Sequence, residues 1–105
     1  MEQALEIPPE LLVGRWRATH GALTADWTFH ANGTFSATVT RQAEVISDST
    51  GTWVLEGTWL HSEYTSDTCG AIDVGYQDRD IFLEFTYNHF VLQTRTGKRK
   101  YERVQ

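Results

Sequence analysis

Two runs of alternating residues around an Asn-Gly pair constrain the fold of this chain more than any other feature. Before Asn32-Gly33, every second residue is apolar, at Leu23, Ala25, Trp27 and Phe29. After the pair, the same alternation gives Phe35, Ala37 and Val39. A period of two places one set of side chains on a buried sheet face. Asn-Gly tolerates the positive φ angles of tight turns, so the sequence predicts a β-hairpin with its tip at this pair.

Alternating runs separated by turn residues continue along most of the chain and predict eight strands. They cover residues 13–20, 23–29, 34–45, 51–56, 58–65, 80–87, 90–94 and 99–104. Residues 47–50 read as a loop, and the glycines and aspartates of residues 66–80 are typical of a longer one. Pro8-Pro9 forbids a helix across that point but allows a short helical turn over residues 10–13.

A meander of eight strands leaves its first and last strands as unpaired edges unless the sheet closes on itself. We therefore predict an all-β fold, an eight-stranded antiparallel up-and-down β-barrel. Residues 1–10 form a short N-terminal arm or helical turn, and residues 11–105 form the barrel domain. A chain of 105 residues, 12% of them aromatic, is long enough to bury a core without disulfides or metals.

Composition excludes several classes of protein. A net charge of −5 argues against general nucleic-acid binding, and a hydrophobic content of 40% argues against disorder. No run of 18 apolar residues occurs, so we expect no membrane partner. Cys69 is the single cysteine, which rules out an internal disulfide and indicates a reducing compartment. We expect a soluble, cytoplasmic protein, although a secreted chain that had lost its leader would look the same.

Several short motifs, in order along the chain, carry a family likeness. They are Gly14-Arg15-Trp16, the hairpin from Trp27 to Phe35, Gly51-Thr52-Trp53, Glu56-Gly57 and Tyr101-Glu102-Arg103. Together they span residues 12–104, and the chain resembles the small bacterial β-barrel domains of lipocalin-like, calycin type. The resemblance implies that Trp16 packs under the barrel with the basic residue Arg103 across its ring. It also implies a modest interior, because the chain is shorter than a secreted lipocalin and lacks that family's disulfides and long C-terminal helix.

Residue types that carry catalysis or bind metals are present but not grouped. No two of His20, His30, His61 and His89 share a strand at a spacing of two, and no Cys or Glu cluster accompanies them. Cys69 has no base nearby in the sequence. The carboxylates Asp26, Glu56, Glu63 and Glu84 fall in the phase opposite the apolar face, which argues against an inward acid–base pair. We therefore predict no catalytic residues, no metal site and no cofactor.

Polar residues that share the inward phase with aromatic ones predict a ligand site, because ligand pockets are mostly apolar with a few convergent polar groups. The predicted site consists of Trp27, Phe35, Arg41, Trp53, Tyr64 and Tyr87. The orientation of Arg41 determines which ligand charge we predict. An unpaired charge is too costly inside a barrel, so an inward Arg41 favours a carboxylate-bearing ligand. A bulge that turns Arg41 to solvent would remove both the acidic ligand and this site.

Three functions remain open at the level of sequence. The first is a non-enzymatic binding protein that holds a small apolar or amphipathic ligand in the barrel; an inward Arg41 would make this ligand acidic. The second is an interaction module of inhibitor or immunity type, with a filled barrel and an exposed aromatic patch around Trp59, Tyr76 or Phe82. The third is a cofactor-free isomerase or cyclase. Trp59 and Phe82 break the inward phase of their strands, which indicates either outer anchors for a partner or a bulge.

The closure line of the barrel carries a cluster of positive charge. If the first strand pairs with the last, the outward residues Arg15, Arg17, Lys98 and Lys100 come together. Either acidic residues such as Glu102 and those of the arm neutralise this seam, or an acidic protein partner docks on it. We favour the arm, through Glu6 and Glu10, because it is tethered beside the first strand.

Overall fold

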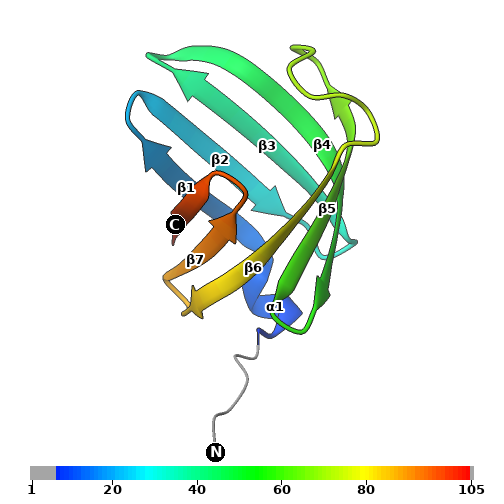
Figure 1. The fold of residues 1–105 in the computed structure, drawn as a ribbon, viewed down its shortest axis with the longest axis vertical. Helices are drawn as coiled ribbons and strands as arrows, with labels where there is room; N and C mark the ends of the chain where they lie inside the picture. The colour runs from blue at the N-terminus through cyan, green and yellow to red at the C-terminus, as the bar shows by residue number, and fades with distance from the viewer. Residues whose placement is uncertain (1–6, 105) are drawn as a thin grey trace, which may run out of the picture.

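The computed structural model describes residues 7–104, which form a closed barrel of eight antiparallel strands in sequence order (Figure 1). A single helical turn, α1, precedes the barrel. The elements are α1 (Pro9–Leu12), β1 (Gly14–His20), β2 (Leu23–Phe29), β3 (Thr34–Arg41), β4 (Glu44–Glu56), β5 (Trp59–Asp67), β6 (Gln77–Phe85), β7 (His89–Thr94) and β8 (Gly97–Arg103). The predicted fold class is confirmed, including the helical turn near the N-terminus.

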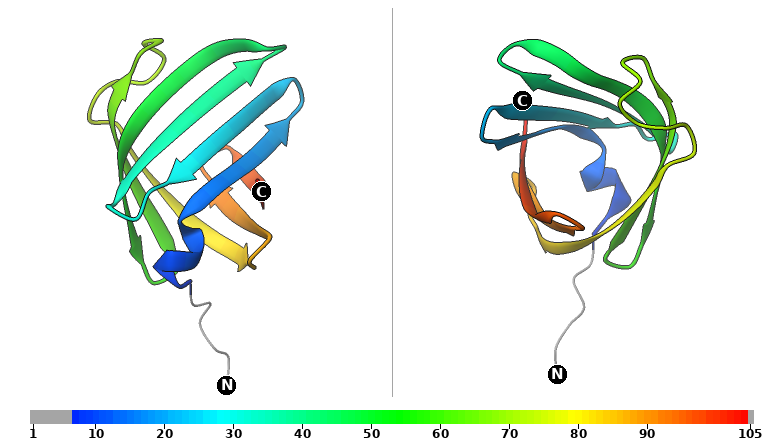
Figure 2. Two further views of the ribbon diagram at one scale, coloured as in Figure 1. Left: turned by 180° about the vertical axis from the view of Figure 1, so that it is seen from behind. Right: turned by 45° about the horizontal axis from the view of Figure 1, so that its top comes forward.

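The barrel closes where β1 pairs with β8, which leaves neither strand as a free edge. Trp16, opposite Arg103 in this pairing, is fully buried, and its indole N–H donates to the carbonyl oxygen of Leu12 at 2.8 Å. The guanidinium of Arg103 lies 4.2 Å from the centre of the Trp16 ring. The predicted packing of Trp16 and Arg103 is confirmed. Leu12 is also fully buried, and α1 lies across one end of the barrel (Figure 2).

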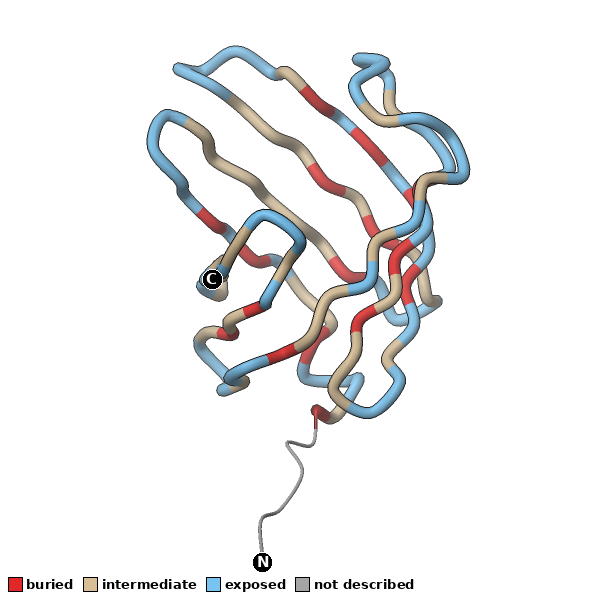
Figure 3. The backbone as a smooth tube through the Cα atoms, viewed as in Figure 1, coloured by how far each residue is buried: buried red, intermediate tan, exposed pale blue. Residues whose placement is uncertain are grey.

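Side chains fill the half of the barrel next to α1. Phe90 lies against Trp16 and Phe82, with ring centroids 4.7 and 5.2 Å apart, and tilted and edge-on contacts of this kind stabilise aromatic cores beyond their buried area. Buried and exposed residues alternate along the strands, as Figure 3 shows on β4 and β5. Gly51 is buried in this alternation, and only glycine fits because a Cβ there would collide with the Phe35 ring and the Glu63 carbonyl oxygen.

The boundary between the third and fourth strands differs from the prediction. β3 ends at Arg41, and Gln42 and Ala43 make a tight turn with φ angles of 50° and 68°. The chain then returns at once as the 13-residue β4, so the continuation of β3 to residue 45 and the loop at 47–50 were wrong. Small polar residues in this stretch look like a loop. In the barrel, Ser47 and Ser49 are buried wall residues of β4, and the Ser47 hydroxyl donates to Asp67 at 2.7 Å.

The register of the sixth strand also differs. β6 begins at Gln77, three residues earlier than predicted, and its pairing with β7 shifts between Phe82 and Glu84. Phe82 lies in the core and Leu83 is exposed, so Phe82 belongs to the inward phase of this strand up to the bulge, which follows it. Phe82 is therefore no anchor for a partner. Trp59 does lie on the outer face, where the Arg79 guanidinium covers it 4.3 Å from the ring centre.

Candidate ligand-binding site

A cavity of about 280 Å³ occupies the half of the barrel away from α1. It lies where the short β7 and β8 face the long β4 and β5, and Figure 1 shows the β7–β8 hairpin ending well below the tip of β3 and β4. The lining residues come from β2, β5, the β5–β6 loop, β6, β7, the β7–β8 turn and β8: Trp27, Phe29, Leu60, Ser62, Tyr64, Tyr76, Asp78, Asp80, Phe90, Leu92, Thr94, Arg95, Thr96, Arg99 and Tyr101.

Aromatic and aliphatic side chains form the floor and one wall of the cavity. Trp27 stacks on Phe35 with ring centroids 4.6 Å apart and meets Tyr64 edge-on at 6.3 Å. Tyr101 stacks on Phe90 at 4.9 Å on the opposite side. Because each ring is fixed by another ring, the cavity presents rigid apolar surfaces without needing a bound molecule to order them.

Two carboxyl groups from β6 enter the same cavity. Asp78 and Asp80 lie two residues apart before the bulge, so both share the inward face with Phe82. Burial raises the pKa of Asp78 above the ordinary value of an aspartate. Burial, and then the charge of Asp78, raise the pKa of Asp80 to about 6. Burial, followed by the charge of Asp80, raises the pKa of Tyr101 to about 12. Both carboxylates are therefore held in a site that disfavours their charge.

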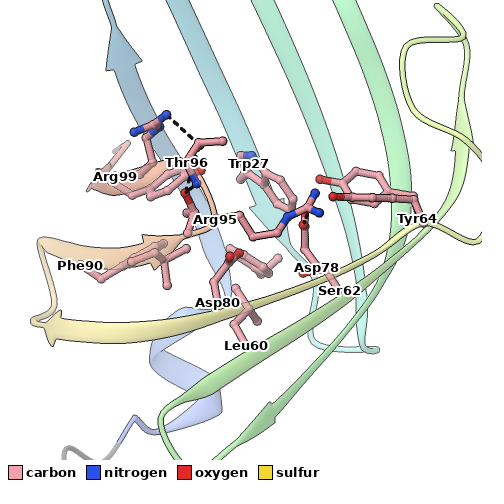
Figure 4. Close-up of a pocket in the computed structure, with 15 residues that line it drawn as sticks. Trp27, Leu60, Ser62, Tyr64, Asp78, Asp80, Phe90, Arg95, Thr96 and Arg99 are labelled. Atoms are coloured by element: carbon pink, nitrogen blue, oxygen red, sulfur yellow. Dashed lines mark hydrogen bonds and ion pairs between the residues drawn. The ribbon is translucent and has the colours of Figure 1, made fainter.

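Two arginines stand at the rim of the cavity. The Arg95 guanidinium is largely exposed, with Nη2 4.0 Å from Oδ1 of Asp78, and lies 5.3 Å from the centre of the Tyr76 ring. Arg99 is engaged locally, since it donates to the Lys98 carbonyl oxygen at 2.9 Å and to Thr96 Oγ1 at 3.1 Å. Figure 4 shows Arg95 reaching toward Asp78 and Arg99 turned to Thr96. Negative charge lies on the barrel wall and positive charge at the mouth.

Two polar groups in the cavity lack a partner among residues 7–104. The Asp80 carboxylate makes no hydrogen bond or ion pair to that part of the chain. Tyr64 is only 5% exposed, and its hydroxyl likewise has no hydrogen-bond partner there. Figure 4 shows the Tyr64 hydroxyl pointing into the cavity, toward Arg95 and Asp78. No fully buried side-chain nitrogen or oxygen of residues 7–104 lacks a hydrogen-bond partner, so both free groups open onto the cavity and are accessible to another molecule in it.

The six residues predicted for the site do not come together. Trp27 and Tyr64 line the cavity, and Phe35 supports both from behind. Trp53 lies toward the opposite end of the barrel, where its indole N–H donates to the Thr34 carbonyl oxygen at 2.9 Å. Tyr87 is 56% exposed and covers Arg103, whose guanidinium lies 4.3 Å from its ring centre.

Arg41 does not border the cavity. It is the last residue of β3, is exposed, and pairs with Leu23 and Glu44 beside the turn at Gln42. In the sequence, Arg41 alternates in phase with the apolar Ala37 and Val39. The pairing of β3 with β4 shifts between Val39 and Thr40, so this phase does not place Arg41 inside the barrel. The argument for an acidic ligand held by Arg41 is therefore wrong.

Sequence reasoning missed the two aspartates. Asp78 fell in a stretch assigned to a loop because of its glycines, and Asp80 was the first residue of the predicted strand that follows; the expectation of no inward carboxylate pair was wrong. Tyr76, Asp78, Asp80 and Phe82 alternate in the sequence, and this alternation was the signal for a strand with both aspartates on one face. Ser62, Thr94 and Tyr101 are further polar residues that line the cavity beside Tyr64.

The other candidate groups lie outside the cavity. His20 and Cys69 are exposed, and residues 7–104 contain no group of three or more His, Cys, Asp or Glu side chains that could hold a metal ion. At the seam, Arg17 donates to Asp26 at 2.8 Å, and this ion pair neutralises one member of the positive cluster. Glu6 of the arm lies outside the described residues.

No protein-family model and no curated protein matches this chain. The fold alone defines its class, a closed eight-stranded up-and-down β-barrel with a cavity at one end. No helix of residues 7–104 is long and apolar enough to cross a membrane.

Proposed function

We propose that this protein is a lipocalin-like, non-enzymatic binding protein that holds one small apolar or amphipathic ligand in its barrel. The single observation that carries the proposal is the cavity of about 280 Å³, with rigid aromatic walls and convergent polar groups. Pockets for drug-sized ligands run from about 300 to 1,000 Å³, so this one fits a smaller molecule. At roughly 30 Å³ per water in the liquid, its volume equals that of about nine waters, which suits a ligand of about ten heavy atoms.

Amide chemical shifts in a titration with phenylpropanol, a neutral amphipathic probe of this size, test the proposal. We expect the shifts to concentrate on cavity residues of β2, β5, β6 and β7. Ser62→Phe places a ring in the cavity from a buried wall position and should abolish the shifts. His61→Phe, one residue earlier, puts the same ring on the other face of β5 and should leave them unchanged. Shifts on the outer surface that persist in Ser62→Phe would refute the proposal. Native mass spectrometry of protein purified from its own host then identifies the resident ligand.

The interaction-module hypothesis has less support. It required a filled barrel and an exposed aromatic patch, whereas the barrel contains a cavity, Phe82 is buried and Tyr76 lines the cavity rim. An acidic protein partner at the seam stays a weaker proposal, carried by the exposed Lys98 and Lys100.

The isomerase or cyclase hypothesis gains one observation. Asp80 has a pKa of about 6 and faces the cavity, as a general acid or base that exchanges protons near neutral pH would. Turnover of the resident ligand by the protein as isolated, lost in Asp80→Asn, would favour this second function over simple binding.

A further inference from the structure

The charges of the cavity are arranged by depth. Asp78 and Asp80 stand on the barrel wall; among residues 7–104 Asp78 has one cation at ion-pair distance, Arg95 at 4.0 Å, and Asp80 has none. The facing titratable groups are the tyrosines, Tyr64 on β5 and Tyr101 on β8, with Tyr76 at the rim. The two cations, Arg95 and Arg99, belong to the mouth. A group that enters past the mouth therefore meets carboxylates.

The unpartnered hydroxyl of Tyr64 is a second and independent sign of a ligand at this place. Tyr64 is only 5% exposed, yet its hydroxyl points into the cavity instead of to a protein acceptor. Together with the two carboxylates, it offers three acceptor groups toward one region. An ammonium group has three N–H donors and no acceptor, so it matches this set.

Aromatic faces beside the carboxylates favour the same kind of ligand. Trp27, Tyr64 and Tyr101 line the cavity along with Asp78 and Asp80. Ring faces attract a cation electrostatically, and they pack equally well on the apolar body that carries it. An anionic ligand would instead place its charge against two carboxylates in a partly desolvated site, which is unfavourable.

We propose that the ligand of this barrel is a primary amine with an apolar body of about ten heavy atoms, bound as the ammonium ion by Asp78 and Asp80 with Tyr64 as the third acceptor. This inference rests on the proposed binding function and names its ligand class. The apolar body lies on Trp27 and Phe90, and the arginines stay at the mouth, where Arg95 faces Asp78 from the rim.

Three probes that share one skeleton test the charge preference: phenylpropylamine, phenylpropanol and phenylpropionate, each titrated calorimetrically into the full chain at pH 7.5. We expect the amine to bind about 10- to 100-fold more tightly than the alcohol, the range for charge-assisted hydrogen bonds, and the carboxylate to bind most weakly. Binding of the alcohol reports on the cavity alone, so failure of alcohol binding counts against the proposed function. Equal affinity of amine and alcohol overturns the amine proposal and leaves the binding function standing.

Asp80→Asn assigns the preference to the site. The variant keeps the shape of the side chain and removes its charge, so amine affinity should fall about 10- to 100-fold while alcohol affinity changes less than about twofold. Glu84→Gln, an exposed carboxylate on the same strand, is the matched control and should leave both affinities unchanged. In the parent protein, amine binding should weaken as the pH falls through about 6, because Asp80 takes up a proton. An Asp80→Asn variant that keeps the full amine preference, or a parent preference that does not change with pH, overturns the proposal.

Discussion

Replacing Asp80 by asparagine should stabilise the protein at neutral pH. Asp80 is a half-buried carboxylate without an ion-pair partner among residues 7–104, and Asp78 stands two residues away on the same face. Burial and the charge of Asp78 raise its pKa from the ordinary 3.8 to about 6. An asparagine has nearly the same shape and no charge, so it removes the cost of holding this group ionised in the folded barrel.

The size of the effect follows from the two pKa values. A rise from 3.8 to about 6 is about two pKa units, which corresponds to about 3 kcal/mol at 1.36 kcal/mol per unit. The Asp80 side chain is only half-buried, so solvent screens part of the interaction and we expect about 1–2 kcal/mol. For a domain of about this size, each kcal/mol raises Tm by about 4–8 °C.

The effect has a definite dependence on pH. The folded protein holds the Asp80 proton more tightly than the unfolded chain, so the stability that this proton contributes is fully present below pH 3.8 and is lost as the pH rises through about 6. The advantage of Asp80→Asn should therefore be largest above pH 6 and shrink toward zero below pH 4.

Urea denaturation of the parent and of Asp80→Asn across this pH range measures the difference. Glu84→Gln is the control, since this exposed carboxylate on the same strand faces solvent. An Asp80→Asn variant that is no more stable than the parent at pH 7.5, or one whose gain is the same at pH 4 and pH 7.5, would refute the reasoning.

Two further predictions concern the frame of the barrel. Trp16→Ala should lower the free energy of unfolding by about 3–5 kcal/mol, because Trp16 is fully buried between α1 and Arg103; a melting temperature within a degree or two of the parent would contradict this. Ala43→Gly should raise stability by about 0.5–1 kcal/mol in urea denaturation, because Ala43 has a φ of 68° that glycine adopts without strain. A loss of stability in that variant would mean that the Ala43 methyl group stabilises the fold by more than its backbone strain costs, which would contradict the prediction.

The strands that the sequence predicted best are those with strong local signals. The hairpin around Asn32-Gly33 needed only alternation and a turn that accepts positive φ, and β2 and β3 flank it as expected. Trp16 and Arg103 are 87 positions apart by their numbering, and the likeness to a family of barrels, together with closure of the meander, was enough to pair them. The eight-strand count and the antiparallel order followed from the same signals.

The candidate site depended on features that no local pattern contains. Alternation determines which residues share a face, but contacts with strands distant in sequence decide which face points inward. The pairing of Asp78 with Ser62 and of Asp80 with Leu60 places both carboxylates on the cavity side, and the bulge beyond Phe82 lets Phe85 rejoin the core.

The sequence by itself determined an all-β meander with an aromatic core, because side-chain alternation and turn residues act over a few positions. Only the tertiary structure decided where the barrel is filled and where it is open. A turn after Arg41 put that residue at the rim, and the short β7–β8 hairpin left the aspartates facing a cavity. Both outcomes depend on strand lengths and pairing shifts, which are settled by packing across the whole barrel.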